Sequence, residues 1–314
     1  MTAPELTLER PVLSLDPTAQ DVHAEAARIR AAGPVVPVDV LGVSAWAVSD
    51  NDIAQRILES PDFAMNSRNW GALQRGEVPA GWPLLKIILG QNMGTSDGAD
   101  HRRLRGPLIK AFTARRVQSM APGIKAITQS LLDEIGRRAE QNPRTPLDLK
   151  ELFATPLPIG VICALFGVDR QHEADLHRLC DNLFDTTSGP ETVAATEAGL
   201  HAFMSRLLDA KTAEPGDDLT SALLAQNAAE SGARANREEL IDTLILVLAA
   251  GHQTTINFFT NTLLSLMTHP GTLAAVRAGQ HSWSKSPRSR CDGTRRWRKA
   301  HSGTRPAMSR SVAC

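Results

Sequence analysis

The hydrophobic and polar positions along this chain predict a mainly α-helical protein with a small β portion. The clearest pattern begins at Leu244. Positions 244–250 are apolar on every side, polar side chains then interrupt the run, and no proline intervenes before Pro270. This predicts one helix of about thirty residues, about 45 Å long, whose first half crosses the protein core. The apolar run is far shorter than the ~20 residues of a bilayer span, so no membrane helix is predicted.

The amino-terminal region has a different pattern. Residues 34–40 and 44–48 run apolar or alternate around Leu41 and Gly42, which predicts a small β-hairpin over about 34–48. Asp50 is placed to cap a helix from about Asn51 to Glu59, and a helical body follows over about 51–280. The Trp- and Pro-bearing segment 68–89 and the segment 185–196 are predicted to be mobile connections over a cavity, or ordinary surface loops.

Gly251 lies inside the long predicted helix, where glycine costs about 1 kcal/mol relative to alanine. One interpretation is that the missing side chain admits a flat ligand, with the hydroxyls of Thr254 and Thr255 beside it. The other is close helix packing, with Thr254 bonding back to the carbonyl of Ala250. His252 is interpreted as a satisfied core histidine, so no metal ligand is assigned.

A second segment, SDGADHRRLRGPLIKAFTARRV, begins at Ser96. Ser96 or Asp97 is a suitable N-cap for a helix. His101 and Arg105 are four residues apart and share one face of that helix. Together they are suitable donors for carboxylates or phosphates, although a solvated basic helix end would have the same pattern.

The phrases DGADHRRLRGPLIKAFTARRV and AAGHQTT, in this order and spacing, resemble the soluble bacterial branch of the cytochrome P-450 family. Segments 153–170 and 217–226 resemble further helices of that fold, and the resemblance runs from about residue 15 to 280. It implies that His101 and Arg105 bind the haem propionates. It further implies that Ala250, Gly251 and Thr255 line the cofactor pocket and that Thr254 belongs to a proton relay. Gln253 occupies the place of the family's usual acid, and an amide hydrogen-bonds but does not pass a proton as a carboxylic acid does.

Two family motifs are absent from the printed sequence. The family's thiolate ligand lies in a phenylalanine-led, glycine-bearing loop, and the last phenylalanine here is Phe259. The family also carries a Glu-x-x-Arg pair after its central helix, whereas Glu239 is the last glutamate. None of the four cysteines has the context of that loop, and none forms a Cys-x-x-Cys pair; they are Cys163, Cys180, Cys291 and Cys314. The predicted fold is therefore a P-450 fold that lacks its C-terminal haem-ligand region.

The formal net charge of zero conceals two unlike parts. Residues 281–314 hold nine Lys or Arg and one acid, Asp292, so this part carries +8 and the remainder −8. The part has almost no aliphatic side chains, which predicts a disordered tail outside the family domain of residues 1–280. A basic nucleic-acid arm with Trp283 and Trp297 as stacking groups is one interpretation. A shifted reading frame near codon 280 is the other, and it is favoured because the resemblance is unbroken up to that point.

The resemblance implies a haem-dependent monooxygenase that inserts one oxygen atom into a small apolar organic substrate, with electrons from a ferredoxin and its reductase. The absent motifs imply that this chain is itself catalytically incompetent. A haem-free remnant and a helical binding protein with a nucleic-acid-binding tail are the alternatives. The lack of a targeting signal suits a cytoplasmic protein.

Overall fold

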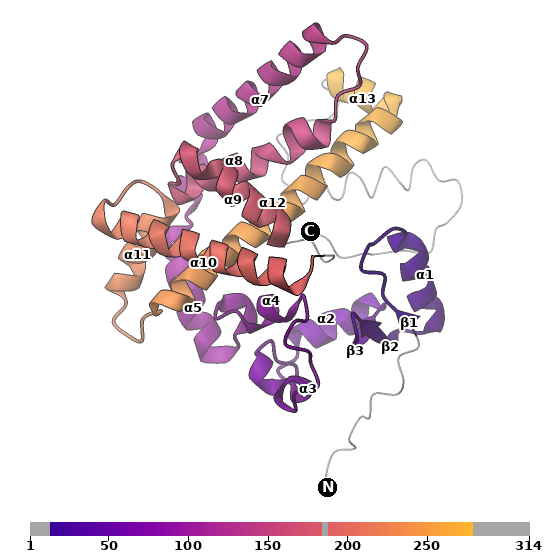
Figure 1. Cartoon of the computed structure of the whole chain (residues 1–314), viewed down its shortest axis with the longest axis vertical. Helices are drawn as coiled ribbons and strands as arrows, with labels where there is room; N and C mark the ends of the chain where they lie inside the picture. Colours follow the sequence, from indigo (N-terminus) through magenta and orange to yellow (C-terminus); the bar gives the residue numbers. More distant parts are fainter. Residues whose placement is uncertain (1–12, 184–187, 279–314) are drawn as a thin grey trace.

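The computed structural model describes residues 13–183 and 188–278, and Figure 1 shows a helical body with a small sheet at one side. The strands are β1 (Leu13–Ser14), β2 (Val35–Val40) and β3 (Val43–Val48). The α-helices are α1 (Val22–Ala32), α2 (Asn51–Glu59), α3 (Gly71–Gln74), α4 (Leu85–Leu89), α5 (Gly98–Ala111), α6 (Ala114–Ser119), α7 (Ala121–Gln141), α8 (Pro156–Phe166), α9 (Glu173–Leu183), α10 (Pro190–Ala213), α11 (Leu219–Ala229), α12 (Arg237–Thr268) and α13 (Pro270–Arg277). Short 3-10 turns are η1 (Ser67–Asn69), η2 (Met93–Thr95) and η4 (Arg170–His172), and the π-helical turn η3 spans Lys150–Ala154. The mainly helical prediction with a small β portion is confirmed.

The predicted hairpin is present, and a third strand joins it. β2 and β3 are antiparallel with Val40 opposite Val43, so Leu41 and Gly42 form a two-residue turn. Both turn residues have positive φ, 54° and 85°, the backbone that such tight hairpin turns require. β1 pairs with β2 in parallel, which the short two-residue run of the sequence did not indicate. Asp50 caps α2 as predicted, because its carboxylate accepts the Asp52 and Ile53 amides, both at 2.9 Å.

α12 is the long helix that the sequence predicted, and it runs through the middle of the helical body (Figure 1). Ile241, Leu244 and Leu248 are fully buried. They belong to one core cluster with apolar side chains of α8, α9, α10 and α11. All the buried residues of α12 lie in its first part, up to Ile256. The second part therefore has little cover.

Residues 68–89 are built into the fold and do not form a simple loop over a cavity. Trp82, Val78 and Leu85 form a second buried cluster with Val43 of β3. The Trp82 indole Nε1 donates to the Val40 carbonyl at 3.0 Å, which attaches the segment to the hairpin. Burial of Trp82 against the hairpin thus attaches the middle of the segment to the sheet, and the mobility expected of the segment stays a prediction.

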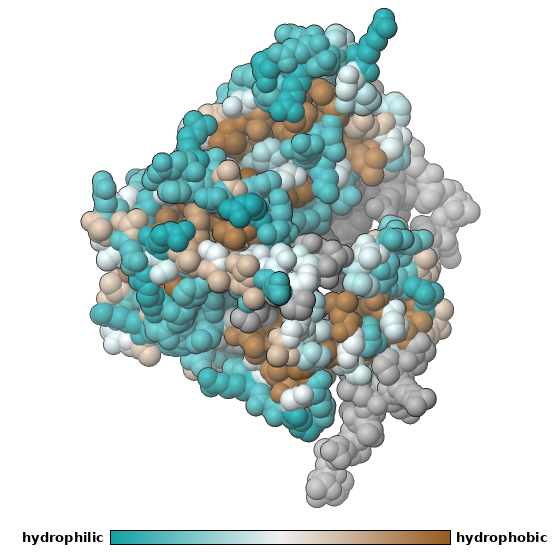
Figure 2. Space-filling view, viewed as in Figure 1, coloured by the Kyte–Doolittle hydropathy of each residue, from teal (hydrophilic) through white to brown (hydrophobic). Residues whose placement is uncertain are grey.

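The other predicted boundaries fall partly outside the described residues. The predicted connection 185–196 ends in the first turns of α10, and residues 184–187 are not described. The predicted tail, 281–314, also lies outside the described residues, together with Cys291 and Cys314. In the part that is described, no helix is long and apolar enough to cross a membrane. Figure 2 shows brown hydrophobic patches among teal polar ones, both over the helical body and near the sheet.

Candidate active site between α5 and α12

The first half of the candidate site is α5. Asp97, which precedes the helix, connects its start to another part of the chain. Asp97 is the N-cap residue, but its carboxylate accepts the Met65 and Asn66 amides, at 3.0 and 2.9 Å. The start of α5 is thus tied to the loop before η1. The predicted basic segment is interrupted at Phe112, after which Thr113 caps the separate helix α6.

His101 and Arg105 lie on α5, one turn apart. His101 Nδ1 is 2.8 Å from the Met93 carbonyl, and because a carbonyl only accepts, Nδ1 carries the proton. That contact fixes the ring orientation and leaves Nε2 for another partner. Arg105 is exposed, and no ion pair to it occurs in the described ranges.

Arg103, between them in sequence, points to α12. Its Nη1 and Nη2 donate to Glu239 Oε2 and Oε1 at 2.9 and 2.6 Å. Glu239 is 9% exposed, and it also forms a reciprocal capping box with Asn236 at the start of α12. Hydrogen bonds from Arg103 lower the pKa of the Glu239 carboxyl, and those same bonds raise the pKa of Arg103. A bidentate pair of this kind fixes the relative position of two helices.

The second half of the candidate site is the middle of α12. Thr254 Oγ1 donates to the Ala250 carbonyl at 2.5 Å, and both residues are exposed. Gln253 Nε2 donates to Asn257 Oδ1 at 3.3 Å. Thr255 is partly buried. No hydrogen bond or ion pair between described residues joins these side chains to His101 or Arg105. The Arg103–Glu239 pair links the two motif-bearing helices.

Gly251 lies close to α8. A Cβ on Gly251 would lie 3.3 Å from Ile162 Cδ1 of α8, so the position freed by glycine is occupied by a side chain of the core. Together with the Thr254 bond to Ala250, this is the close packing that the sequence offered as the second interpretation. The place of Gly251 beside a flat ligand stays a prediction, because this contact concerns only the direction in which a Cβ would point.

Comparison with known proteins identifies the fold family. The protein-family model described as Cytochrome P450 matches residues 200–288 of this chain. The 2-hydroxy-5-methyl-1-naphthoate 7-hydroxylase of Streptomyces carzinostaticus is 39% identical over 271 residues, which cover 86% of this chain and 65% of that enzyme. Two solved structures, CYP154C4 from Streptomyces sp. W2061 and CYP154A1 from Streptomyces coelicolor A3(2), are 40% and 41% identical with TM-scores of 0.79 and 0.76. The alignments cover 88% and 86% of this chain and 67% of each of those structures. This chain belongs to the cytochrome P-450 family.

The P-450 chain spans about two thirds of the length of these relatives, 65% of the hydroxylase and 67% of each solved structure. The family match ends at residue 288, eight residues beyond the predicted domain boundary at 280. The boundary itself stays a prediction.

The described residues of this P-450 suit the propionates of a haem but not its iron. The exposed Arg105 is a suitable donor for a propionate, and His101, whose Nδ1–H is used by the Met93 carbonyl, would donate through Nε2 as the protonated imidazolium. The described cysteines do not suit the iron, because Cys163 and Cys180 are fully buried in the core cluster. Burial raises the pKa of both thiols to about 12, so both stay protonated at neutral pH.

Two residues of this region were missed at the sequence level. No local pattern marks Arg103, and Glu239 stands out in the sequence only as the last glutamate. The signal was the sequence Asn236-x-x-Glu239, a capping box that marks the start of a helix. Arg103, the partner of Glu239 on α5, is 136 positions away in the sequence, and no local pattern spans that separation.

Proposed function

We propose that this chain carries the haem-propionate and oxygen-side elements of a P-450 monooxygenase. The observation that carries the proposal is the Arg103–Glu239 pair, since it joins the helix with the His101 motif to the helix with the Thr254 motif. Family membership supports the same assignment.

In this proposal His101 and Arg105 hold the two propionates of haem from α5. Ala250, Gly251 and Thr255 belong to the neighbouring wall, where Gly251 acts by allowing α8 to approach. Bound haem would supply the redox centre at which oxygen is activated. Thr254 would position a proton at its Oγ1, which now donates to the Ala250 carbonyl, and Gln253 would orient that group without passing a proton.

The proposed substrate is a small apolar organic molecule, and the proposed electron donor is a ferredoxin with its reductase. The S. carzinostaticus relative is named as a hydroxylase of a substituted naphthoate, which supports a substrate of this size and class. We place the protein in the cytoplasm.

We further propose that the 314-residue chain does not carry out the reaction by itself. The printed sequence has no phenylalanine-led cysteine loop and no Glu-x-x-Arg motif after α12. The proposed origin is a reading-frame shift near codon 280, with residues 281–314 as a tail foreign to the family domain. The test is to sequence the locus and translate all three frames. A frame that supplies both motifs is expected, and their absence from all three would contradict the shift.

Haem binding provides the functional test. We expect the purified chain, supplied with haem, to bind it weakly and to give no thiolate-type band in the reduced carbonyl spectrum. Replacing Arg105 by alanine should weaken haem binding by about tenfold, since it removes one charge-assisted contact of about 1.5 kcal/mol. Replacing His101 by alanine should also weaken haem binding, because it removes the second propionate contact. Arg102→Ala is the matched control, because Arg102 is exposed on another face of α5.

Two outcomes would contradict this proposal. Equal haem affinity in the Arg102, His101 and Arg105 variants would show that α5 does not hold the propionates. A stable thiolate band that disappears in Cys291→Ala would show that residues 281–314 supply the ligand after all.

A further inference from the structure

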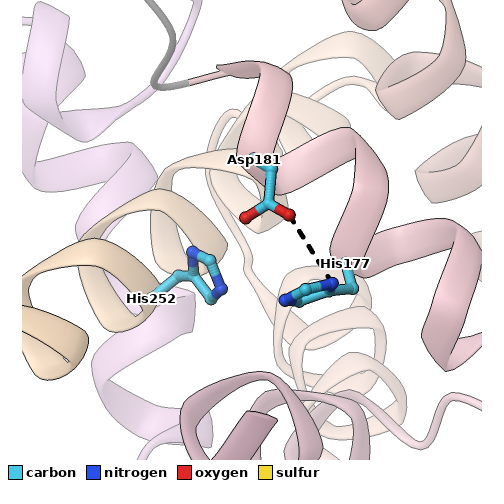
Figure 3. A group of neighbouring side chains, drawn as sticks. All are labelled: His177, Asp181 and His252. Carbon is cyan, nitrogen blue, oxygen red and sulfur yellow. Dashed lines mark ion pairs between the residues drawn. The ribbon is translucent and has the colours of Figure 1, made fainter. Parts of the chain in front are cut away.

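A group of three metal-ligating side chains lies between α9 and α12, apart from the Arg103–Glu239 pair. His177 and Asp181 come from α9 and His252 comes from α12. One ligand atom from each lies within 4.8 Å of the other two. Figure 3 shows the three side chains pointing toward the same space between the two helices.

We propose that His177, Asp181 and His252 form a binding site for a divalent transition-metal ion, with Zn²⁺ as the ion that suits it best. Two imidazoles and one carboxylate are a donor set that zinc accepts, with one further position for water. The inference goes beyond the proposed monooxygenase role, in which none of the three residues has an assigned part.

The backbone places the ligands for joint binding. His177 and Asp181 are four residues apart on α9, so their side chains share one helix face. His177 Nδ1 is 3.6 Å from Asp181 Oδ2, and its Nε2 is buried without a hydrogen-bond partner among described residues. The rings of His177 and His252 are 6.1 Å apart at 78°, an edge-to-face arrangement across the two helices.

The distances require only side-chain adjustment. Ligands at about 2.0–2.1 Å from a tetrahedral zinc are about 3.3 Å from one another. The present spacing of up to 4.8 Å therefore has to close by about 1.5 Å. His177 and Asp181 have side chains that are 35% and 54% exposed, so they have room to rotate while the buried His252 stays in place.

The protonation of the buried ligand favours metal binding. Desolvation lowers the pKa of His252, an effect that Asp181 opposes and His177 reinforces. A neutral imidazole has the lone pair that a metal ion needs. The exposed side chain of Asp181 leaves the site open to ions from solvent.

Zinc titration of the purified 314-residue chain tests the site. We expect one high-affinity Zn²⁺ per chain, a higher melting temperature with zinc, and at least tenfold weaker binding in His177→Ala and in Asp181→Asn. Both substituted side chains are partly exposed, so these variants are expected to stay folded, and circular dichroism checks this. His201→Ala is the matched control: His201 also pairs with a carboxylate on α12, Glu238 at 2.6 Å, but no third ligand lies nearby among the residues that the structure describes.

X-ray absorption of the zinc-loaded chain provides a second measurement. Only nitrogen and oxygen ligands at about 2.0–2.1 Å are expected, and sulfur at about 2.3 Å would place the zinc on a cysteine elsewhere. Sulfur ligation, unchanged affinity in the His177 and Asp181 variants, or an equal loss in His201→Ala would each overturn the proposal.

Discussion

The contact between Arg103 and Glu239 decides how α5 and α12 meet. Their side chains are only 23% and 11% exposed, and both guanidinium contacts are short. Removing one partner leaves the other charge in a poorly solvated position, where an uncompensated charged group is costly. The arginine between the two predicted propionate residues is thus a structural link and not a free donor.

We predict that Arg103→Ala lowers the free energy of unfolding by about 1–3 kcal/mol. The reason is the stranded Glu239 carboxylate, which also loses part of its role in capping α12. Urea denaturation measures the effect. The exposed Arg102→Ala should change the same quantity by less than about 0.5 kcal/mol, and equal effects in the two variants would contradict the assigned contact.

The pH dependence of stability follows from the lowered pKa of Glu239. A carboxyl whose folded pKa is depressed adds stability above its unfolded pKa, here 4.5, and loses it as the pH falls through the folded value. We predict that the difference in unfolding free energy between wild type and Glu239→Gln has its largest value near neutral pH, where the Glu239 carboxyl is ionised in both the folded and the unfolded state. It should shrink as the pH falls below about 4.5. A difference that stays constant to about pH 3 would show that Glu239 makes no charge-dependent contribution.

At the scale of elements, α12 combines a buried first half with a glycine in its middle. Gly251 costs helix stability, yet its missing Cβ lets Ile162 of α8 lie against the backbone. Gly136 of α7 offers a comparison, since a Cβ there would meet nothing within 4 Å and the position is exposed.

We predict that Gly136→Ala raises the free energy of unfolding by about 1 kcal/mol, the usual helix gain. Gly251→Ala should raise the free energy of unfolding by less, because the Ile162 side chain has to leave its rotamer at a cost of about 0.5–1.5 kcal/mol. Thermal or urea unfolding of both variants measures the difference. A full gain at Gly251 would mean that the α8–α12 contact is looser than the structure shows.

At the scale of the whole molecule, the helical body is well covered around the first half of α12 and poorly around the second. Leu264 and Met267, three residues apart on one side of α12, are 58% and 68% exposed. About a third of each relative's own length is not matched by this chain. An exposed apolar helix surface of this kind favours association.

We predict that the purified chain forms concentration-dependent oligomers and that Leu264→Lys with Met267→Lys reduces them. Light scattering after size-exclusion chromatography measures the mass. Leu58→Lys on α2 is the matched control, since Leu58 is 78% exposed but lies outside this helix. Association that persists unchanged in the double variant would rule out this part of α12 as the contact surface.

Much of the fold followed from local patterns that act over a few residues. The hairpin turn at Leu41 and Gly42, the Asp50 cap and the extent of α12 could all be read from the sequence, because turns, caps and apolar periodicity are determined by near neighbours. The family resemblance was visible for the same reason, as its motifs are short and continuous.

The sequence by itself thus determined the helical class, the hairpin and the residues that carry the family motifs. Tertiary structure decided which side chains meet: Arg103 with Glu239, Ile162 with Gly251, and His252 with His177. These partners are far apart in the chain, and their approach depends on the packing of whole helices around a shared core. Periodicity defines the face of each helix, but only the packed core determines what that face touches.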